Sequence, residues 1–156
     1  MVRIVTGKID SLKTTRMRER YLRDRKGDGF IAIKRMIKDK VHSYEAVRLS
    51  TGERLPLIVR DEFVYTTFPV SCQIGPYLFN QETIDRITQS IGEMIRQKIE
   101  PLYLDEIGVL ELEGKCFDHI FKKMVASGLD LVVSVREDLI EAFLAKYRIS
   151  EYEIIQ

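Results

Sequence analysis

Residues 2–15 read VRIVTGKIDSLKTT, and this stretch decides the fold of the chain. Its first part, Val2 to Thr6, is a short apolar run that predicts a buried strand. The pattern breaks over Gly7 to Leu12, and Lys13 to about Lys26 then consists of good helix formers with apolar residues on one side. A strand, a glycine-led turn and a helix in this order open an α/β unit.

The same alternation returns in the second half of the chain. Asn80 has the features of a helix N-cap, and the residues after it carry isoleucines at helical spacing. A strand from Pro101 to Glu106 then ends in two acids, and a further helix ends near Gly128. The apolar run from Leu129 to Val135 is typical of a parallel strand that is covered on both faces. We therefore predict an α/β chain with a mostly parallel sheet.

The middle of the chain has a different pattern. Two β-prone segments, Tyr44 to Leu49 and Arg54 to Val59, flank the four-residue turn Ser50 to Glu53, and this predicts a β-hairpin. Further β-prone residues surround Pro69. We expect an antiparallel insertion over about residues 30–72 beside the main sheet. At 156 residues, the whole chain, 1–156, has the length of a single domain.

The composition excludes several classes of protein. Apolar residues make up 45% and charged residues 31%, which argues against disorder, collagen and a disulfide scaffold. No stretch approaches the ~18–20 apolar residues that span a bilayer, and the N-terminal apolar run is too short for a signal peptide. We expect a cytoplasmic protein with no membrane partner. Cys72 and Cys116 lack CxxC spacing, so we expect two reduced thiols.

The net charge of +1 conceals an uneven distribution along the chain. Residues 1–60 hold 16 basic and 7 acidic side chains, or +9, and residues 61–156 hold 9 basic and 17 acidic side chains, or −8. The arginines of the first predicted helix point in several directions, and no aromatic stacking platform accompanies them. The pattern therefore argues against nucleic acid as a partner and is consistent with a positive potential around a phosphate site.

The turn after the first strand is a candidate phosphate-binding loop. Such a loop has the pattern G-x-x-x-x-G-K-[ST], in which the lysine reaches the β/γ-phosphates and the hydroxyl binds Mg²⁺. Gly7, Lys13 and Thr14 match it, but Leu12 stands at the second glycine, where a Cβ crowds the phosphate or widens the loop. Asp10 adds a carboxylate that repels an anion. By itself the pattern leaves an ordinary strand-to-helix turn as an alternative.

The second candidate is the acid pair Asp105 and Glu106 at the end of an apolar strand. Acids are costly to bury there without a purpose. An aspartate in this place can hold Mg²⁺, and the neighbouring glutamate can orient and deprotonate an attacking water. Both candidates lie at the carboxyl ends of predicted strands, where doubly wound sheets bind their ligands.

Three further stretches carry a resemblance. Residues 105–112 read DEIGVLEL, residues 74–80 read IGPYLFN and residues 133–136 read VSVR. In order and spacing, from about residue 2 to 155, they resemble the small P-loop proteins of the cancer-related nucleoside-triphosphatase family. The resemblance implies a RecA-like three-layer α/β fold with an inserted antiparallel β-hairpin region. It also implies slow, Mg²⁺-dependent hydrolysis of nucleoside triphosphates such as ATP or GTP.

The resemblance assigns roles to individual residues. Lys13, Glu106 and Arg136 are the implied catalytic residues: Lys13 contacts the β/γ-phosphates, Glu106 positions water and Arg136 senses the γ-phosphate. Thr14 and Asp105 are the implied Mg²⁺ ligands. The implied nucleotide-binding residues are Gly7, Lys8, Ile9, Asp10, Ser11, Leu12, Lys13, Thr14 and Thr15.

The loop also departs from the family, whose sequence there is G-x-P-G-x-G-K-T-T. Ile9 replaces its proline, and Asp10 and Leu12 replace two of its glycines. Two other hypotheses therefore stay open beside a triphosphatase. One is a degenerate nucleotide-binding module that acts through a protein partner, and the other is a P-loop phosphotransferase.

Overall fold

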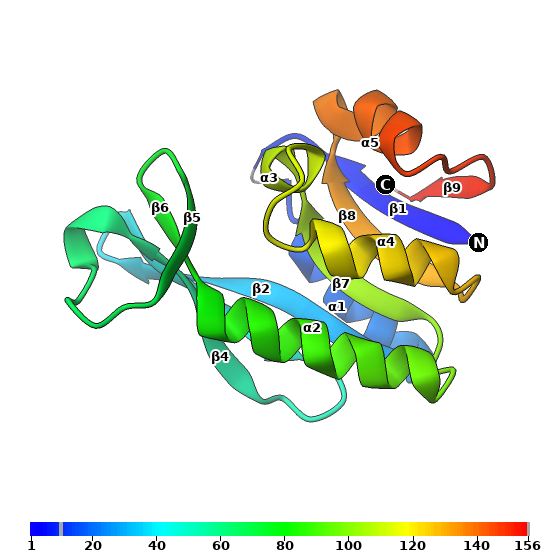
Figure 1. The fold of residues 1–156 in the computed structure, drawn as a ribbon, viewed down its shortest axis with the longest axis horizontal. Coiled ribbons are helices and arrows are strands. Elements are labelled where there is room, and N and C mark those ends of the chain that lie inside the picture. Colours follow the sequence, from blue (N-terminus) through cyan, green and yellow to red (C-terminus); the bar gives the residue numbers. More distant parts are fainter. Residues whose placement is uncertain (10, 156) are drawn as a thin grey trace.

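The computed structural model describes residues 1–9 and 11–155, and its centre is a nine-stranded mixed sheet with helices on both faces (Figure 1). The strands are β1 (Val2–Gly7), β2 (Asp28–Ile37), β3 (Lys40–Arg48), β4 (Arg54–Arg60), β5 (Val70–Ile74), β6 (Tyr77–Asn80), β7 (Leu102–Ile107), β8 (Leu131–Arg136) and β9 (Tyr152–Ile155). The helices are α1 (Lys13–Asp24), α2 (Gln81–Arg96), α3 (Val109–Leu112), α4 (Asp118–Ala126) and α5 (Ile140–Lys146). Two 3-10 turns are η1 (Asp61–Phe63) and η2 (Glu137–Leu139).

The strand order is β5-β6-β4-β3-β2-β7-β8-β1-β9. The last five strands of this order, β2-β7-β8-β1-β9, pair in parallel with their neighbours, and β8 lies between β1 and β7. The strand that leads into the predicted phosphate loop and the strand that carries the acid pair are therefore separated by one strand. This arrangement confirms the predicted RecA-like α/β fold with a mostly parallel core.

Strand β2 belongs to both parts of the sheet. Its first residues, Asp28–Phe30, pair in parallel with β7, and its outer part pairs antiparallel with β3 as far as Ile37. Gly29 permits the close approach to β7, because a Cβ there would lie 2.0 Å from the carbonyl oxygen of Tyr103. The antiparallel strands continue through β4, β6 and β5, and they form an arm that projects from the body of the molecule (Figure 1).

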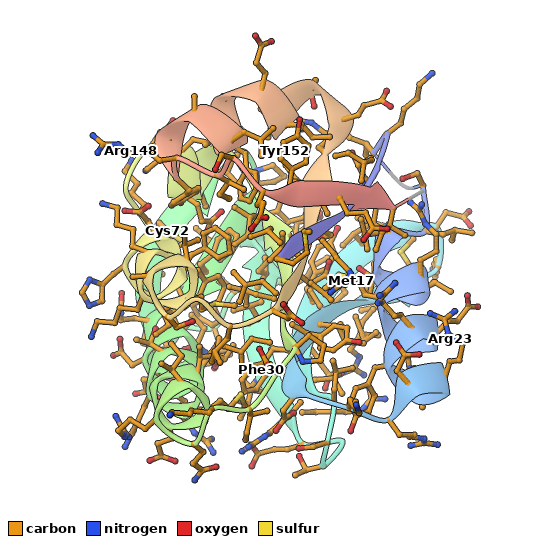
Figure 2. The ribbon with its side chains drawn as sticks, turned by 90° about the vertical axis from the view of Figure 1, so that its right-hand side faces the viewer. Met17, Arg23, Phe30, Cys72, Arg148 and Tyr152 are labelled. Carbon is orange, nitrogen blue, oxygen red and sulfur yellow. A yellow bond between two sulfur atoms is a disulfide. The ribbon has the colours of Figure 1, made fainter. Side chains whose placement is uncertain are left out.

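Each face of the sheet has its own hydrophobic core. Helices α2, α4 and α5 cover one face, and the predicted isoleucine positions of α2, including Ile87 and Ile91, are buried there. Helix α1 covers the other face, where Met17 points toward the sheet and Arg23 toward solvent (Figure 2). Asn80 caps α2 as predicted, because its side chain accepts a hydrogen bond from the Thr83 N–H. In the described part of the chain, every helix is too short or too polar to cross a bilayer.

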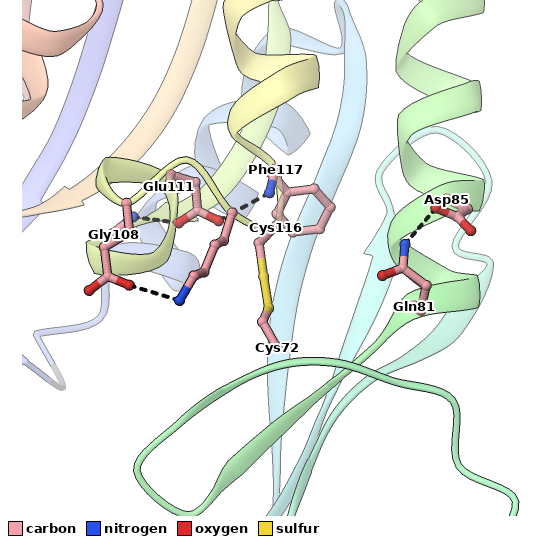
Figure 3. The surroundings of a disulfide bond; sticks show 9 residues. Cys72, Gln81, Asp85, Gly108, Glu111, Cys116 and Phe117 are labelled. Carbon is pink, nitrogen blue, oxygen red and sulfur yellow. Dashed lines mark hydrogen bonds and ion pairs between the residues drawn. A yellow bond between two sulfur atoms is a disulfide. The ribbon is translucent and has the colours of Figure 1, made fainter.

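The expectation of two reduced thiols is wrong in this structure. Cys72 of β5 forms a disulfide with Cys116, which lies between α3 and α4 (Figure 3). The two residues are 44 positions apart, and spacing alone could not show that the arm folds back across the segment before α4. Their Cα atoms lie 6.9 Å apart, and the bond joins the arm to the body of the molecule.

Breaking this disulfide is expected to destabilise the fold. Because the bond closes a loop of 44 residues in the unfolded chain, its loss lowers the free energy of unfolding by about 2–4 kcal/mol. Urea unfolding with and without a thiol reductant measures the effect, and mass spectrometry after thiol alkylation counts the free cysteines. The Cys72→Ser variant should start at the lower stability and not respond to reductant. The neighbouring Ser71→Ala variant should behave as the wild type, and a wild type that alkylates fully without reductant contradicts the bond.

Candidate functional site

The predicted loop and the predicted acid pair meet at the carboxyl ends of the parallel strands. Thr14, in the first turn of α1, donates a hydrogen bond from Oγ1 to Oδ2 of Asp105 at 2.5 Å. The two residues are 91 positions apart, and this contact brings the implied Mg²⁺ ligands together. Gly7, the last residue of β1, pairs in register with Arg136. The end of β8, with the predicted residue Arg136, therefore lies at the same edge of the sheet.

Asp105 is held by donors from three different segments. In addition to Thr14, its Oδ2 accepts the Ala32 N–H at 3.0 Å, and its Oδ1 accepts the Ser134 hydroxyl at 2.5 Å. Ser134 also accepts the Glu106 N–H at 2.6 Å, so one hydroxyl on β8 positions both acids. Sequence reasoning missed this role of Ser134. Its signal was a lone hydroxyl within the apolar run that forms β8.

Burial dominates the electrostatics of the acid pair. It raises the pKa of Asp105, and the hydrogen bonds from Ala32, Ser134 and Thr14 act in the opposite direction. Burial, and next the neighbouring Asp105 carboxylate, raise the pKa of Glu106 to about 8, although this side chain keeps surface that is open to two adjoining cavities. Two neighbouring carboxylates repel each other when both are ionised, and a nearby cation stabilises their charged forms.

The donor set fits a hard divalent cation. The Thr14 hydroxyl and the Asp105 carboxylate are oxygen ligands of the kind Mg²⁺ prefers, and Mg²⁺ sites commonly take their remaining ligands from water and substrate phosphates. Among residues 1–9 and 11–155, no group of three or more His, Cys, Asp or Glu side chains is placed to hold a metal ion.

The loop itself is closed around the lysine side chain. Nζ of Lys13 donates to the carbonyl oxygen of Lys8 at 2.8 Å and contacts Oγ of Ser11 at 3.5 Å. A Cβ on Gly7 would lie 2.2 Å from that same Oγ, so a larger residue there would displace the Ser11 side chain. Ile9 is 67% exposed. Asp10, whose carboxylate was predicted to repel an anion, lies outside the described residues.

Leu12 adopts the backbone conformation that a glycine takes most easily. Its φ is 65° and its ψ is 28°, in the left-handed region, directly before α1 begins. The side chain is 69% exposed and lines the rim of a cavity. The loop therefore accommodates leucine at the family's glycine position with the side chain turned outward, at a backbone cost of about 1–2 kcal/mol.

Two cavities adjoin at Lys13 and Glu106. The first has a volume of about 330 Å³ and contains the start of α1, and its lining residues are Ser11, Leu12, Lys13, Thr14, Thr15, Ala32, Ile33, Lys34, Tyr44 and Glu106. The second has a volume of about 240 Å³ and shares Lys13, Tyr44 and Glu106 with the first. Of the remaining predicted residues, Ile9 and Arg136 line the second cavity, whereas Gly7, Lys8 and the buried Asp105 line neither.

Arg136 is engaged by a neighbouring acid. Its Nε donates to Oδ1 of Asp138 at 2.5 Å, and its second terminal nitrogen donates to Oδ2 at 3.0 Å. Arg136 therefore lies at the wall of the second cavity but is already paired. Its guanidinium has five N–H groups in all, so those that do not contact Asp138 are the donors it can offer to a phosphate.

A buried glutamate fixes the segment that follows the acid pair. The carboxyl group of Glu111 accepts the Gly108 N–H at 2.9 Å and the Phe117 N–H at 3.2 Å (Figure 3). It thereby ties the turn after Glu106 to the residue next to Cys116. Burial is the main cause that raises the pKa of Glu111 to about 7.

Comparisons with known proteins agree with the family resemblance and with the fold. A family model described as NTPase matches residues 3–156. The solution structure of a human cancer-related nucleoside triphosphatase superposes with a TM-score of 0.63 over 98% of this chain and 86% of that chain. The two chains are 15% identical, so this likeness shows the fold alone. No match is found among curated proteins.

Replacing Leu12 with glycine tests the left-handed backbone. Leu12→Gly should leave the free energy of unfolding unchanged or raise it by up to about 1 kcal/mol. The variant removes the cost of a left-handed backbone at leucine, and this gain equals or exceeds the cost of the greater conformational entropy of glycine in the unfolded chain. Leu22→Gly, on the exposed side of α1, is the matched control and should lose about 1 kcal/mol. Urea unfolding of both variants gives the comparison. Equal losses in the two variants would contradict the conformation assigned to Leu12.

Glu111 should make stability depend on pH. Its pKa is raised to about 7 from an ordinary value of 4.5, so between these values the folded state keeps a proton that the unfolded state releases. The free energy of unfolding therefore falls as pH rises through this window, by at most roughly 3 kcal/mol, and this contribution is level above pH 7.

The Glu111→Gln variant isolates this contribution. Glutamine does not titrate, so unfolding curves at pH 5 and pH 8 should differ less in the variant than in the wild type. Glu141→Gln, at an exposed position of α5, is the control and should retain the wild-type difference. An unchanged pH dependence in Glu111→Gln would show that Glu111 titrates normally.

Proposed function

Because the chain belongs to the NTPase family, we propose that it binds a nucleoside triphosphate, such as ATP or GTP, with Mg²⁺ and hydrolyses it to the diphosphate and phosphate. The observation that carries this proposal is the hydrogen bond from Thr14 to Asp105. It joins the start of the helix that would hold the phosphates to the acid strand that would hold the metal.

The cavity at the start of α1 is the place for the triphosphate. Backbone N–H groups at the start of a twelve-residue helix favour an anion, and Lys13 adds a positive charge beside them. Nζ of Lys13 now donates to the Lys8 carbonyl oxygen, a bond that a β- or γ-phosphate oxygen can replace. The basic N-terminal part of the chain adds a favourable potential.

The metal role falls to Thr14 and Asp105. A Mg²⁺ ion held by these two residues would supply positive charge that offsets the charge developing on the phosphate oxygens. The Ala32 N–H and the Ser134 hydroxyl hold the Asp105 carboxylate in place, so it is oriented before the metal arrives. A hydroxyl and a carboxylate are sufficient protein ligands for an ion that keeps several waters.

Glu106 is the residue that would orient and deprotonate the attacking water. Its backbone N–H is tied to Ser134, and its side chain borders both cavities. The water oxygen attacks the γ-phosphorus, the bond to the β,γ-bridging oxygen breaks, and the diphosphate leaves with the electron pair. Arg136 would stabilise the γ-phosphate through guanidinium N–H groups that do not contact Asp138.

Nucleotide binding and phosphate release, measured separately, test the proposal. Lys13→Ala should weaken binding of a fluorescent triphosphate analogue, because a positive charge beside the phosphates is lost. Glu106→Gln should still bind the analogue but release phosphate about 100-fold or more slowly, the scale of a lost general base. Lys123→Ala and Glu141→Gln change exposed residues of the same types and should match the wild type.

The outcomes separate a hydrolase from a degenerate module. A wild type that binds no triphosphate at millimolar concentration contradicts the proposal. Binding without phosphate release, unchanged in Glu106→Gln, supports a nucleotide-binding module that acts through a protein partner.

Removing the metal should stop hydrolysis while leaving the chain folded. EDTA should abolish phosphate release, and added Mg²⁺ should restore it, with circular dichroism unchanged throughout. Thr14→Val keeps the shape of the side chain without its oxygen and should raise the Mg²⁺ concentration needed for half-maximal release. Full activity in EDTA would exclude the proposed role of Thr14 and Asp105.

A further inference from the structure

The cavity of about 240 Å³ beside Glu106 has an apolar wall that the hydrolysis of a triphosphate does not use. Six aliphatic or aromatic side chains form this wall, from the loop, the arm and the segments after β7 and β8: Ile9, Ile74, Phe79, Val109, Leu110 and Leu139. The other lining residues are Lys13, Tyr44, Glu106, Ile107, Gly108, Ser134 and Arg136, and five of these carry a charged or hydroxyl group. A mostly apolar pocket with a few converging polar groups is typical of a small-molecule site, and a water molecule needs no such wall.

This cavity lies on the nucleophile side of the proposed triphosphate site. The larger cavity contains residues 11–15, whose backbone and side chains would hold the phosphates. The smaller cavity lacks Thr14 and Thr15 but contains Glu106, the residue that would orient the attacking oxygen. Because the two cavities share Lys13 and Glu106, a ligand in the smaller one faces the end of the triphosphate.

Two of the apolar side chains remain exposed in the described structure. Ile9, from the loop after β1, is 67% exposed, and Ile74, from β5 of the arm, is 39% exposed. Covering such side chains with an apolar ligand releases water and contributes about 25 cal/mol for each Å² buried. The charged and hydroxyl groups of the lining favour a ligand with a hydroxyl group over a plain hydrocarbon.

The wall is held in shape before any ligand arrives. Ile74 follows two residues after Cys72, whose disulfide ties β5 to the segment before α4. Val109 and Leu110 follow Gly108, whose N–H is held by the Glu111 carboxyl group. A pocket organised in advance binds with less loss of conformational freedom.

We propose that this cavity binds a small alcohol with an apolar body, which accepts the γ-phosphoryl group in place of water. The proposal rests on the proposed function, because the bound triphosphate is the phosphoryl donor. The alcohol oxygen forms a bond to the γ-phosphorus, and the bond from that phosphorus to the β,γ-bridging oxygen breaks. The electron pair leaves on the diphosphate, and the hydroxyl proton passes to water. The products are a phosphate monoester and a nucleoside diphosphate.

Benzyl alcohol, an apolar ring with one primary hydroxyl, is the probe that tests this inference. With ATP and Mg²⁺, the diphosphate formed should exceed the free phosphate, and phosphorus NMR should show the benzyl phosphate monoester. Saturation-transfer NMR should detect benzyl alcohol on the protein in the presence of a non-hydrolysable ATP analogue. Benzyl methyl ether, which has no hydroxyl, should compete for the site without forming a monoester.

Two variants of equal exposure distinguish the cavity from general effects of the alcohol. Ile74→Gln places an amide in the wall and should raise the half-saturating benzyl alcohol concentration about tenfold, the scale of one lost apolar contact. Ile154→Gln changes an isoleucine of edge strand β9 that is also 39% exposed, and it should match the wild type.

Each failure has a different meaning. Equal amounts of diphosphate and free phosphate at saturating benzyl alcohol overturn the acceptor site and leave the triphosphatase proposal standing. Displacement of benzyl alcohol by the ATP analogue overturns it too, because the cavity then holds the nucleotide itself. If no diphosphate forms under any condition, the proposed function fails, and the acceptor inference fails with it for lack of a donor.

Discussion

The hydrogen bond between the Thr14 hydroxyl and the Asp105 carboxylate is the contact on which the rest of the site depends. It spans the gap that β8 leaves between β1 and β7, and it can form only if three parallel strands end at the same edge. The register of β1 against β8 and of β8 against β7 is therefore a condition for function as well as for packing. Ser134 supports the contact from β8, since its hydroxyl is bonded to both members of the acid pair.

The same edge of the sheet concentrates opposite charges. The basic N-terminal part of the chain carries the loop, and the acidic C-terminal part carries Asp105 and Glu106, so the net charge of +1 is a cancellation. A triphosphate with a divalent cation has the complementary arrangement, with anionic oxygens toward Lys13 and a cation toward Asp105. Burial is the main cause that raises the pKa of both acids, and the Asp105 carboxylate raises the pKa of Glu106 further.

The arm and the disulfide add a second wall to this edge. Strand β2 leaves the parallel core and leads into the antiparallel strands, and these strands bring Tyr44, Ile74 and Phe79 beside Glu106. The bond between Cys72 and Cys116 holds β5 against the segment that follows the acid strand. The insertion thus lines the space beside the candidate catalytic residue Glu106.

The sequence by itself determined the features that depend on residues close to one another along the chain. Helical and strand periodicity, the Asn80 cap, the loop ending in Lys13 and Thr14, and the acids after β7 are all local patterns, so the α/β fold and most of the candidate site could be predicted. Only the tertiary structure decided the rest: the disulfide, the role of Ser134, the outward side chain of Leu12, the pairing of Arg136 with Asp138, and the two cavities. These depend on strand order, on register and on how the arm folds back, and no short stretch of sequence encodes the distance between residues that such long-range packing brings together.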